Sequence, residues 1–137
     1  MLLAKHVEVQ IKLRAEIREH MPFLFNEDSR TTHNAAGADV DLLPYIDDVC
    51  REALRFIPSI PMTVREPLKD DVIGGYYVPA EQIYILANAI NRLTSFWGPT
   101  ANEFDPRWRE LPDTNVPNAF MTFLAGPRGC IGRKLRR

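Results

Sequence analysis

The sequence predicts a mainly α-helical fold that carries a small β-sheet, an α+β arrangement, and three observations lead to this prediction. Two stretches with helical spacing of apolar residues, 1–22 and 42–57, lie in the first half of the chain. Short runs rich in β-branched and aromatic residues, divided by glycine and proline, fill residues 63–90. Residues 91–122 are rich in proline and asparagine and show no period, which is typical of a long irregular segment. With 137 residues, the chain is long enough for one domain with a modest core.

The first predicted helix, residues 1–22, is amphipathic. Val9, Leu13 and Ile17 recur at every fourth position and therefore fall on one face. Oppositely charged residues four positions apart support the polar face. Pro22 ends the helix because proline has no N–H to donate to the preceding turn.

Residues 26–41 are polar and without a period, and they predict a surface loop before the second helix. The second helix is predicted over residues 42–57, where Pro44 suits the first turn. One face of this helix is apolar and consists of Ile46, Val49, Cys50, Ala53, Leu54 and Ile57. Glu52 and Arg55 fall roughly opposite that face, and taken alone they predict an exposed ion pair of about 0.3–0.5 kcal/mol.

The β region, residues 63–90, contains the runs "TVRE", "DVIGGYYV" and "QIYILANAI". Gly74-Gly75 and Pro79 divide these short runs. After the irregular segment, residues 123–137 are expected to form a glycine-rich loop and the start of a further helix.

The composition argues against several classes of protein. The formal net charge of −1 at pH 7 disfavours binding of nucleic acid. No apolar run is long enough to span a membrane, and the first residues do not follow a signal-peptide pattern. The two cysteines and three histidines are scattered, so a disulfide framework and a zinc site are both disfavoured, and an intracellular protein is expected.

The most constrained stretch is "FLAGPRGCIG", which places Cys130 among glycines, a proline and an arginine. Backbone N–H groups at the start of the following helix favour a thiolate, the form that a metal ligand or a nucleophile needs. A small buried apolar side chain is the plain alternative. The sequence specifies no histidine base for a nucleophile, and it lacks the spacing of a phosphate-binding loop.

These ten residues match the pattern F-x-x-G-x-R-x-C-x-G at every fixed position, through Phe123, Gly126, Arg128, Cys130 and Gly132. The stretch resembles the haem-binding signature of the cytochrome P-450 family, the haem-thiolate monooxygenases. The resemblance implies that Cys130 is the axial ligand of the iron in haem b, and that the other four residues help to bind this cofactor. It also implies the C-terminal part of the cytochrome P-450 fold.

Two further stretches resemble motifs of the same family. Glu52 and Arg55 match its E-x-x-R motif, and "FDPRW" resembles the segment that provides a third member, Arg107. The spacing between proline and arginine is one residue shorter here than the family's usual spacing. The resemblance implies a structural triad that locks the fold and takes no part in catalysis.

Arg65 follows the second helix at the family's usual distance, and with Arg128 it resembles the arginine pair that binds haem propionates. A surface arginine on a strand is the alternative. The stretch "SIPMTV" resembles a segment that lines the substrate pocket, through Ile60, Met62, Thr63 and Val64. Its apolar character favours a lipophilic substrate, although the same residues would also suit a plain core.

The order of these motifs extends the resemblance over nearly the whole chain. Residues 1–22 resemble the family's J helix, 42–57 its K helix, 91–122 its meander, and 123–137 the haem-ligand loop with the start of the next helix. Family members are several times longer. We therefore expect this chain to correspond to a C-terminal portion, without the helix that activates oxygen and without a membrane anchor.

The resemblance implies a haem-thiolate monooxygenase, which activates O₂, inserts one oxygen atom into a lipophilic organic substrate and reduces the other to water. The electrons would come from a flavoprotein reductase or another donor, and the basic residues from Arg128 onward favour docking of an acidic one. Relatives are often anchored in the endoplasmic reticulum. The alternative from another class is a non-catalytic remnant or small haem-binding module that lacks the oxygen-activating half. A generic α+β interaction domain would leave the cysteine loop unexplained.

Overall fold

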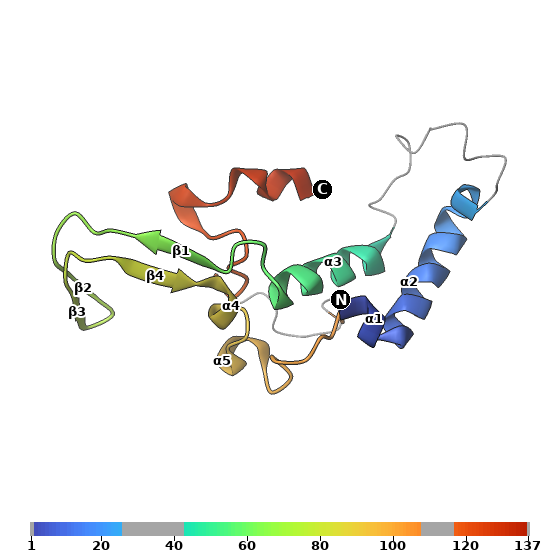
Figure 1. Cartoon of the computed structure of the whole chain (residues 1–137), viewed down its shortest axis with the longest axis horizontal. Coiled ribbons are helices and arrows are strands. Elements are labelled where there is room, and N and C mark those ends of the chain that lie inside the picture. The colour runs from blue at the N-terminus through green and yellow to red at the C-terminus, as the bar shows by residue number, and fades with distance from the viewer. Residues whose placement is uncertain (1, 26–42, 108–116, 137) are drawn as a thin grey trace.

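The computed structural model describes residues 2–25, 43–107 and 117–136. It confirms a mainly helical chain with small antiparallel sheets. The loop predicted at 26–41 lies outside the described residues, as do residues 108–116 of the predicted irregular segment. The ribbon is elongated, with α2 near one end and the hairpin of β2 and β3 at the other (Figure 1).

The first predicted helix is divided in two. α1 spans Leu2–Lys5 and α2 spans Val7–His20, followed by the 3-10 turn η1 at Pro22–Phe25. The prediction of a single helix over 1–22 therefore differs from the structure at His6. There the backbone leaves the helical conformation and the imidazole packs 5.0 Å from the ring of Phe104, measured between centroids.

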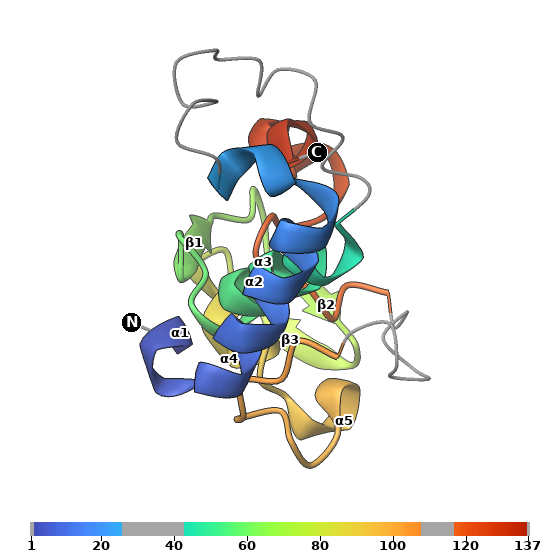
Figure 2. The ribbon, with the colours of Figure 1, turned by 90° about the vertical axis from the view of Figure 1, so that its right-hand side faces the viewer.

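α3, Pro44–Phe56, begins with the expected proline and packs against α2 around Val9, Val49 and Phe104. Its first turn has no side-chain cap of its own. Glu16 of α2 supplies one instead, since its two carboxylate oxygens accept the N–H groups of residues 45 and 46 at 2.8 and 2.9 Å. Figure 2 shows how α2 and α3 cross.

The faces of α3 differ from the sequence prediction. Cys50 and Ile57 of the predicted apolar face are exposed, whereas Glu52 and Arg55 are buried. The reason is that backbone from residues 91–105 lies over the polar face and hydrogen-bonds to it. Helical periodicity identifies the two faces of a helix, but it does not reveal which neighbours cover them.

Two short antiparallel pairs form the β part. β1, Met62–Arg65, pairs with β4, Ile83–Leu86, with Thr63 opposite Ile85. β2, Asp71–Ile73, and β3, Tyr76–Val78, form an antiparallel hairpin within the predicted β region. Gly74 and Gly75 connect them with φ values of 58° and 86°, and two successive positive φ angles favour glycine at both positions.

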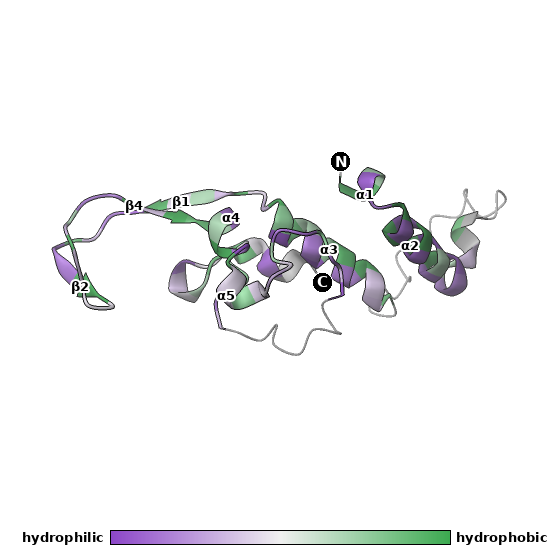
Figure 3. Ribbon diagram, turned by 90° about the horizontal axis from the view of Figure 1, so that it is seen from below, coloured by the Kyte–Doolittle hydropathy of each residue, from purple (hydrophilic) through white to green (hydrophobic). Residues whose placement is uncertain are grey.

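The remaining described elements are short helical turns that follow β4 in the sequence. They are α4 at Ala87–Ile90, α5 at Thr94–Trp97, and the 3-10 turns η5 at Gly126–Arg128 and η6 at Ile131–Arg136. Apolar surface remains exposed on β1 and β4, which appear green in Figure 3. An exposed apolar face of this kind is typical of a surface that binds a ligand or another segment.

Candidate functional site

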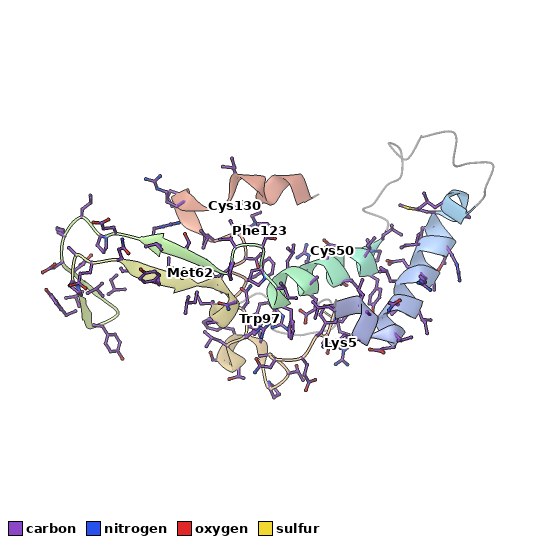
Figure 4. The ribbon with its side chains drawn as sticks, in the orientation of Figure 1. Lys5, Cys50, Met62, Trp97, Phe123 and Cys130 are labelled. Carbon is purple, nitrogen blue, oxygen red and sulfur yellow. The ribbon has the colours of Figure 1, made fainter. Side chains whose placement is uncertain are left out.

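The loop that carries Cys130 is held by its own backbone. The N–H of Cys130 donates to the carbonyl oxygen of Phe123 at 2.8 Å, and the N–H of Gly129 donates to that of Gly126 at 2.9 Å. These two bonds fold residues 123–130 into a tight turn that ends at the cysteine. The Cys130 side chain is exposed, and Figure 4 shows it on the C-terminal segment next to Phe123.

The three glycines of this loop have different local roles. Gly126 has a φ of 72°, which side chains with a Cβ rarely adopt. A Cβ at Gly129 would come within 3.1 Å of the Gly126 carbonyl oxygen, so a larger residue there would require the backbone to shift by a few tenths of an ångström. A Cβ at Gly132 would lie 3.6 Å from the Cys130 sulfur, so glycine there leaves this side of the thiol uncovered.

Glu52 and Arg55 form a buried ion pair, with 1% and 3% of their surfaces exposed. The Nε and Nη2 of Arg55 donate to the two carboxylate oxygens of Glu52, each at 2.7 Å. The remaining N–H groups of the guanidinium donate to the carbonyl oxygens of Asn91, Ala101 and Glu103 at 2.7–2.9 Å. The guanidinium also lies 5.0 Å from the centroid of the Trp97 ring. A buried arginine is tolerated because every donor has an acceptor.

Arg107 is joined to this pair through Asp105. The backbone N–H of Asp105 donates to Glu52 Oε1 at 2.8 Å, and its carboxylate binds the Arg107 guanidinium. The hydrogen bond from Arg107 lowers the pKa of Asp105 below its ordinary value. The Arg107 side chain is 58% exposed, in contrast to the buried pair.

The other predicted binding residues lie on β1, beside it and in the cysteine loop. Arg65 at the end of β1 donates through Nη1 to the Thr63 hydroxyl at 3.0 Å and to the Val64 carbonyl oxygen at 2.8 Å. Arg128 is exposed. The predicted pocket-lining residues Ile60, Met62 and Val64 are exposed as well, and Thr63 is half-buried. Figure 4 labels Met62 on β1.

Three residues that the structure places at the site were not predicted from the sequence. Gly129 could have been found, since a glycine directly before the cysteine was visible in the motif. Asn91 and Thr122 are buried and join α3 to the start of the cysteine loop. Neither belongs to a repeated pattern, so the sequence carried no signal for them.

Within the described residues, no group of three or more His, Cys, Asp or Glu side chains is arranged to hold a metal ion. Across residues 2–25, 43–107 and 117–136, no helix has the length and apolar character that crossing a membrane requires.

Comparison with known proteins gives one consistent result. The family model described as Cytochrome P-450 matches residues 1–137. The chain is 38% identical to cytochrome P-450 monooxygenase sphH of Aspergillus fumigatus, over 96% of this chain and 25% of that protein. It is 37% identical to cytochrome P-450 monooxygenase buaD of Petromyces alliaceus, over 99% of this chain and 26% of that protein.

A solved structure has the same fold. It is a retinoic acid-bound cyanobacterial CYP120A1, which superposes with a TM-score of 0.77 at 23% identity. The match covers 99% of this chain and 30% of that one. The chain thus spans about a quarter of the length of the curated relatives it matches.

Proposed function

The chain belongs to the cytochrome P-450 family, and on that premise we propose that it provides the thiolate-bearing side of a haem monooxygenase. The proposed overall reaction inserts one atom of O₂ into a lipophilic organic substrate. The other atom leaves as water, with two electrons from a donor and two protons. The observation that carries the proposal is the exposed Cys130 side chain at the end of a constrained loop. The hydrogen bond from the Cys130 N–H and the positive φ of Gly126 hold this loop in shape.

The residues present fit haem b as the cofactor. Cys130 is a single soft ligand, and haem iron in this family takes one axial thiolate from the protein. Gly132 leaves the adjacent side of the sulfur free of a side chain. Apolar side chains on β1 and before it are exposed, as a large apolar ligand requires. When bound, haem iron supplies the activation of O₂.

Each predicted cofactor-binding residue would then have a defined role. Cys130 would bind the iron, and Phe123, Gly126 and Gly132 would shape the loop around it. The exposed Arg128, together with Arg65, would bind the two propionates, because a guanidinium fork matches a carboxylate. Arg65 would have to exchange its present bonds to Thr63 and Val64 for this purpose.

Glu52, Arg55 and Arg107 are assigned a structural task. The buried pair fixes the segment 91–105 against α3, and Asp105 carries the connection to Arg107. In this proposal Arg107 stabilises the outer end of that connection, at the surface. None of the three exchanges a proton with substrate.

The exposed side chains indicate the class of substrate and the charge of the electron donor that we propose. The exposed Ile60, Met62 and Val64 and the half-buried Thr63 next to them favour a lipophilic substrate. Arg128 and Arg133 are exposed on the C-terminal segment, and they favour an acidic electron donor such as a flavoprotein reductase.

The test is the carbon monoxide difference spectrum of the chain loaded with haemin and then reduced. Thiolate ligation predicts a strongly red-shifted Soret band that disappears in Cys130→Ala. Cys50→Ala is the matched control, since Cys50 is also exposed but lies on α3, and it should keep the band. A band unchanged in Cys130→Ala, or no haem uptake by the parent chain, would contradict the assignment. Haem binding without turnover in the presence of a reductase would favour a haem-binding module.

A further inference from the structure

A buried polar connection links the end of α3 to the loop that carries Cys130. We propose that Asn91 and Thr122 are positioning residues, which fix the start of the cysteine loop against α3 and thereby set the position of Cys130. Asn91 is fully buried, and Thr122 is 9% exposed. The assignment of Cys130 as the iron ligand belongs to the proposed function, and only that part of the inference rests on it.

Asn91 uses every polar group of its side chain. Its Nδ2 donates to the carbonyl oxygen of Arg55 at 3.2 Å and to the hydroxyl of Thr122 at 2.8 Å. Its Oδ1 accepts the backbone N–H of Met121 at 2.7 Å. The backbone carbonyl of Asn91 also accepts a hydrogen bond from Arg55 Nη1. A buried amide with two donors and one acceptor satisfied in this way fixes its neighbours, because losing any partner leaves a polar atom unpaired.

Thr122 completes the connection on the other side. Its hydroxyl accepts from Asn91 and donates to the carbonyl oxygen of Leu54 at 2.8 Å. Residues 54–56 form the last turn of α3, where backbone carbonyls have no partner within the helix. Side chains from other segments donate to these carbonyl oxygens. The Thr122 hydroxyl donates to that of Leu54, and Asn91 Nδ2 donates to that of Arg55. Arg92 Nη2 donates to that of Phe56 at 2.6 Å. The C-terminal end of α3 therefore serves as the anchor, the fixed structure to which Asn91 and Thr122 attach the start of the cysteine loop.

Only a few covalent and hydrogen bonds separate Thr122 from Cys130. Met121 and Thr122 directly precede Phe123, whose carbonyl accepts the N–H of Cys130 at 2.8 Å. The N–H of Leu124 closes a turn on the Met121 carbonyl at 3.0 Å, and Leu124 has a φ of 55°. Such a left-handed residue needs support from its surroundings. Fixing residues 121 and 122 therefore fixes the partner of the Cys130 N–H.

The experiment uses the full 137-residue chain with two substitutions at one position and a matched control. Thr122→Val is nearly isosteric but removes both hydrogen bonds of the hydroxyl, whereas Thr122→Ser keeps them. Thr94→Val, at the exposed start of α5, is the control for a threonine-to-valine change. The first readout is hydrogen exchange of the Cys130 amide, with the Met21 amide at the end of α2 as an internal reference. The second is the fraction of thiolate-ligated carbon monoxide complex after loading with haemin.

In Thr122→Val we expect the Cys130 amide to exchange at least about tenfold faster, while Met21 is unchanged, because two hydrogen bonds are lost and the buried amide of Asn91 keeps one donor without a partner. The thiolate-ligated fraction should fall in the same variant. Thr122→Ser should restore both readouts, and Thr94→Val should alter neither. Equal acceleration at Cys130 and Met21 would indicate a general loss of stability and would overturn the inference. The inference would also be overturned if Thr122→Ser gave the same two readouts as Thr122→Val, or if Thr122→Val gave the same readouts as the parent chain. If the parent chain takes up no haem, the proposed function fails, and hydrogen exchange alone still decides the inference.

Discussion

Replacing Arg55 by lysine keeps the positive charge and removes the planar guanidinium. In the structure all five N–H groups of Arg55 are used: two on Glu52, and one each on the carbonyl oxygens of Asn91, Ala101 and Glu103. A lysine ammonium has only three donors. At least two of these five hydrogen bonds are therefore lost, even if lysine uses all three of its donors. Glu52 Oε1 also accepts the N–H of Asp105, so at least one of the other four acceptors is left without a donor.

The expected cost is large because the site is buried. Each buried acceptor left without a donor costs about 1–3 kcal/mol, so one or two of them lower the free energy of unfolding by about 1–6 kcal/mol. Domains of ordinary size are stable by only about 5–15 kcal/mol. Arg55→Lys is thus expected to remove a large share of the stability, although it is nominally a conservative change.

Urea unfolding followed by circular dichroism measures this loss, through the linear dependence of the free energy on denaturant concentration. Arg51→Lys is the matched control on the same helix, because Arg51 forms a partly exposed ion pair with Asp47 at 2.7 Å. Such a pair contributes less than about 1 kcal/mol. If Arg55→Lys lowers the free energy of unfolding no more than Arg51→Lys does, the argument from buried acceptors is refuted.

Two further predictions concern other parts of the fold. The Glu16 carboxylate accepts two N–H groups of the first turn of α3, so Glu16→Gln should lower the free energy of unfolding in urea by about 1 kcal/mol. Glu19→Gln, at an exposed position of α2, should leave it unchanged, and an equal loss in both variants would argue against capping. The hydrogen bond from the Tyr77 hydroxyl lowers the pKa of Asp70 below 3.8 and raises the pKa of Tyr77 above 10.0. The hairpin should therefore be stabilised between these limits. This contribution is lost as the pH falls through the lowered pKa of Asp70 or rises through the raised pKa of Tyr77. An NMR titration in which Asp70→Asn leaves the Tyr77 transition at the same pH would contradict this.

Local patterns predicted the local features of this chain. The fold class, the proline at the start of α3 and the glycine turn between β2 and β3 follow from propensities that act within a few residues. The cysteine loop was found for the same reason, since its glycines are needed by the backbone of the loop itself. Each of these features depends on neighbours in sequence, and a sequence shows such neighbours directly.

Contacts between distant segments were not predictable in this way. The polar face of α3 is buried because residues 91–105 cover it, and periodicity alone placed that face in solvent. Asn91 and Thr122 are 31 positions apart and belong to no motif, yet they share a hydrogen bond at 2.8 Å. The break at His6 also depends on a distant residue, since its ring packs on Phe104.

The buried pair and the cysteine loop depend on the same few backbone groups of α3. Arg55 binds the Asn91 carbonyl with its side chain, while its own carbonyl accepts from the Asn91 amide. Asn91 is therefore held twice by one residue, and through its amide it holds Met121 and Thr122. Loss of the guanidinium would leave the backbone carbonyl of Asn91 without this hydrogen bond and so weaken the support of the loop. Stability of the Glu52–Arg55 pair and placement of Cys130 are consequently coupled, because one buried asparagine belongs to both networks.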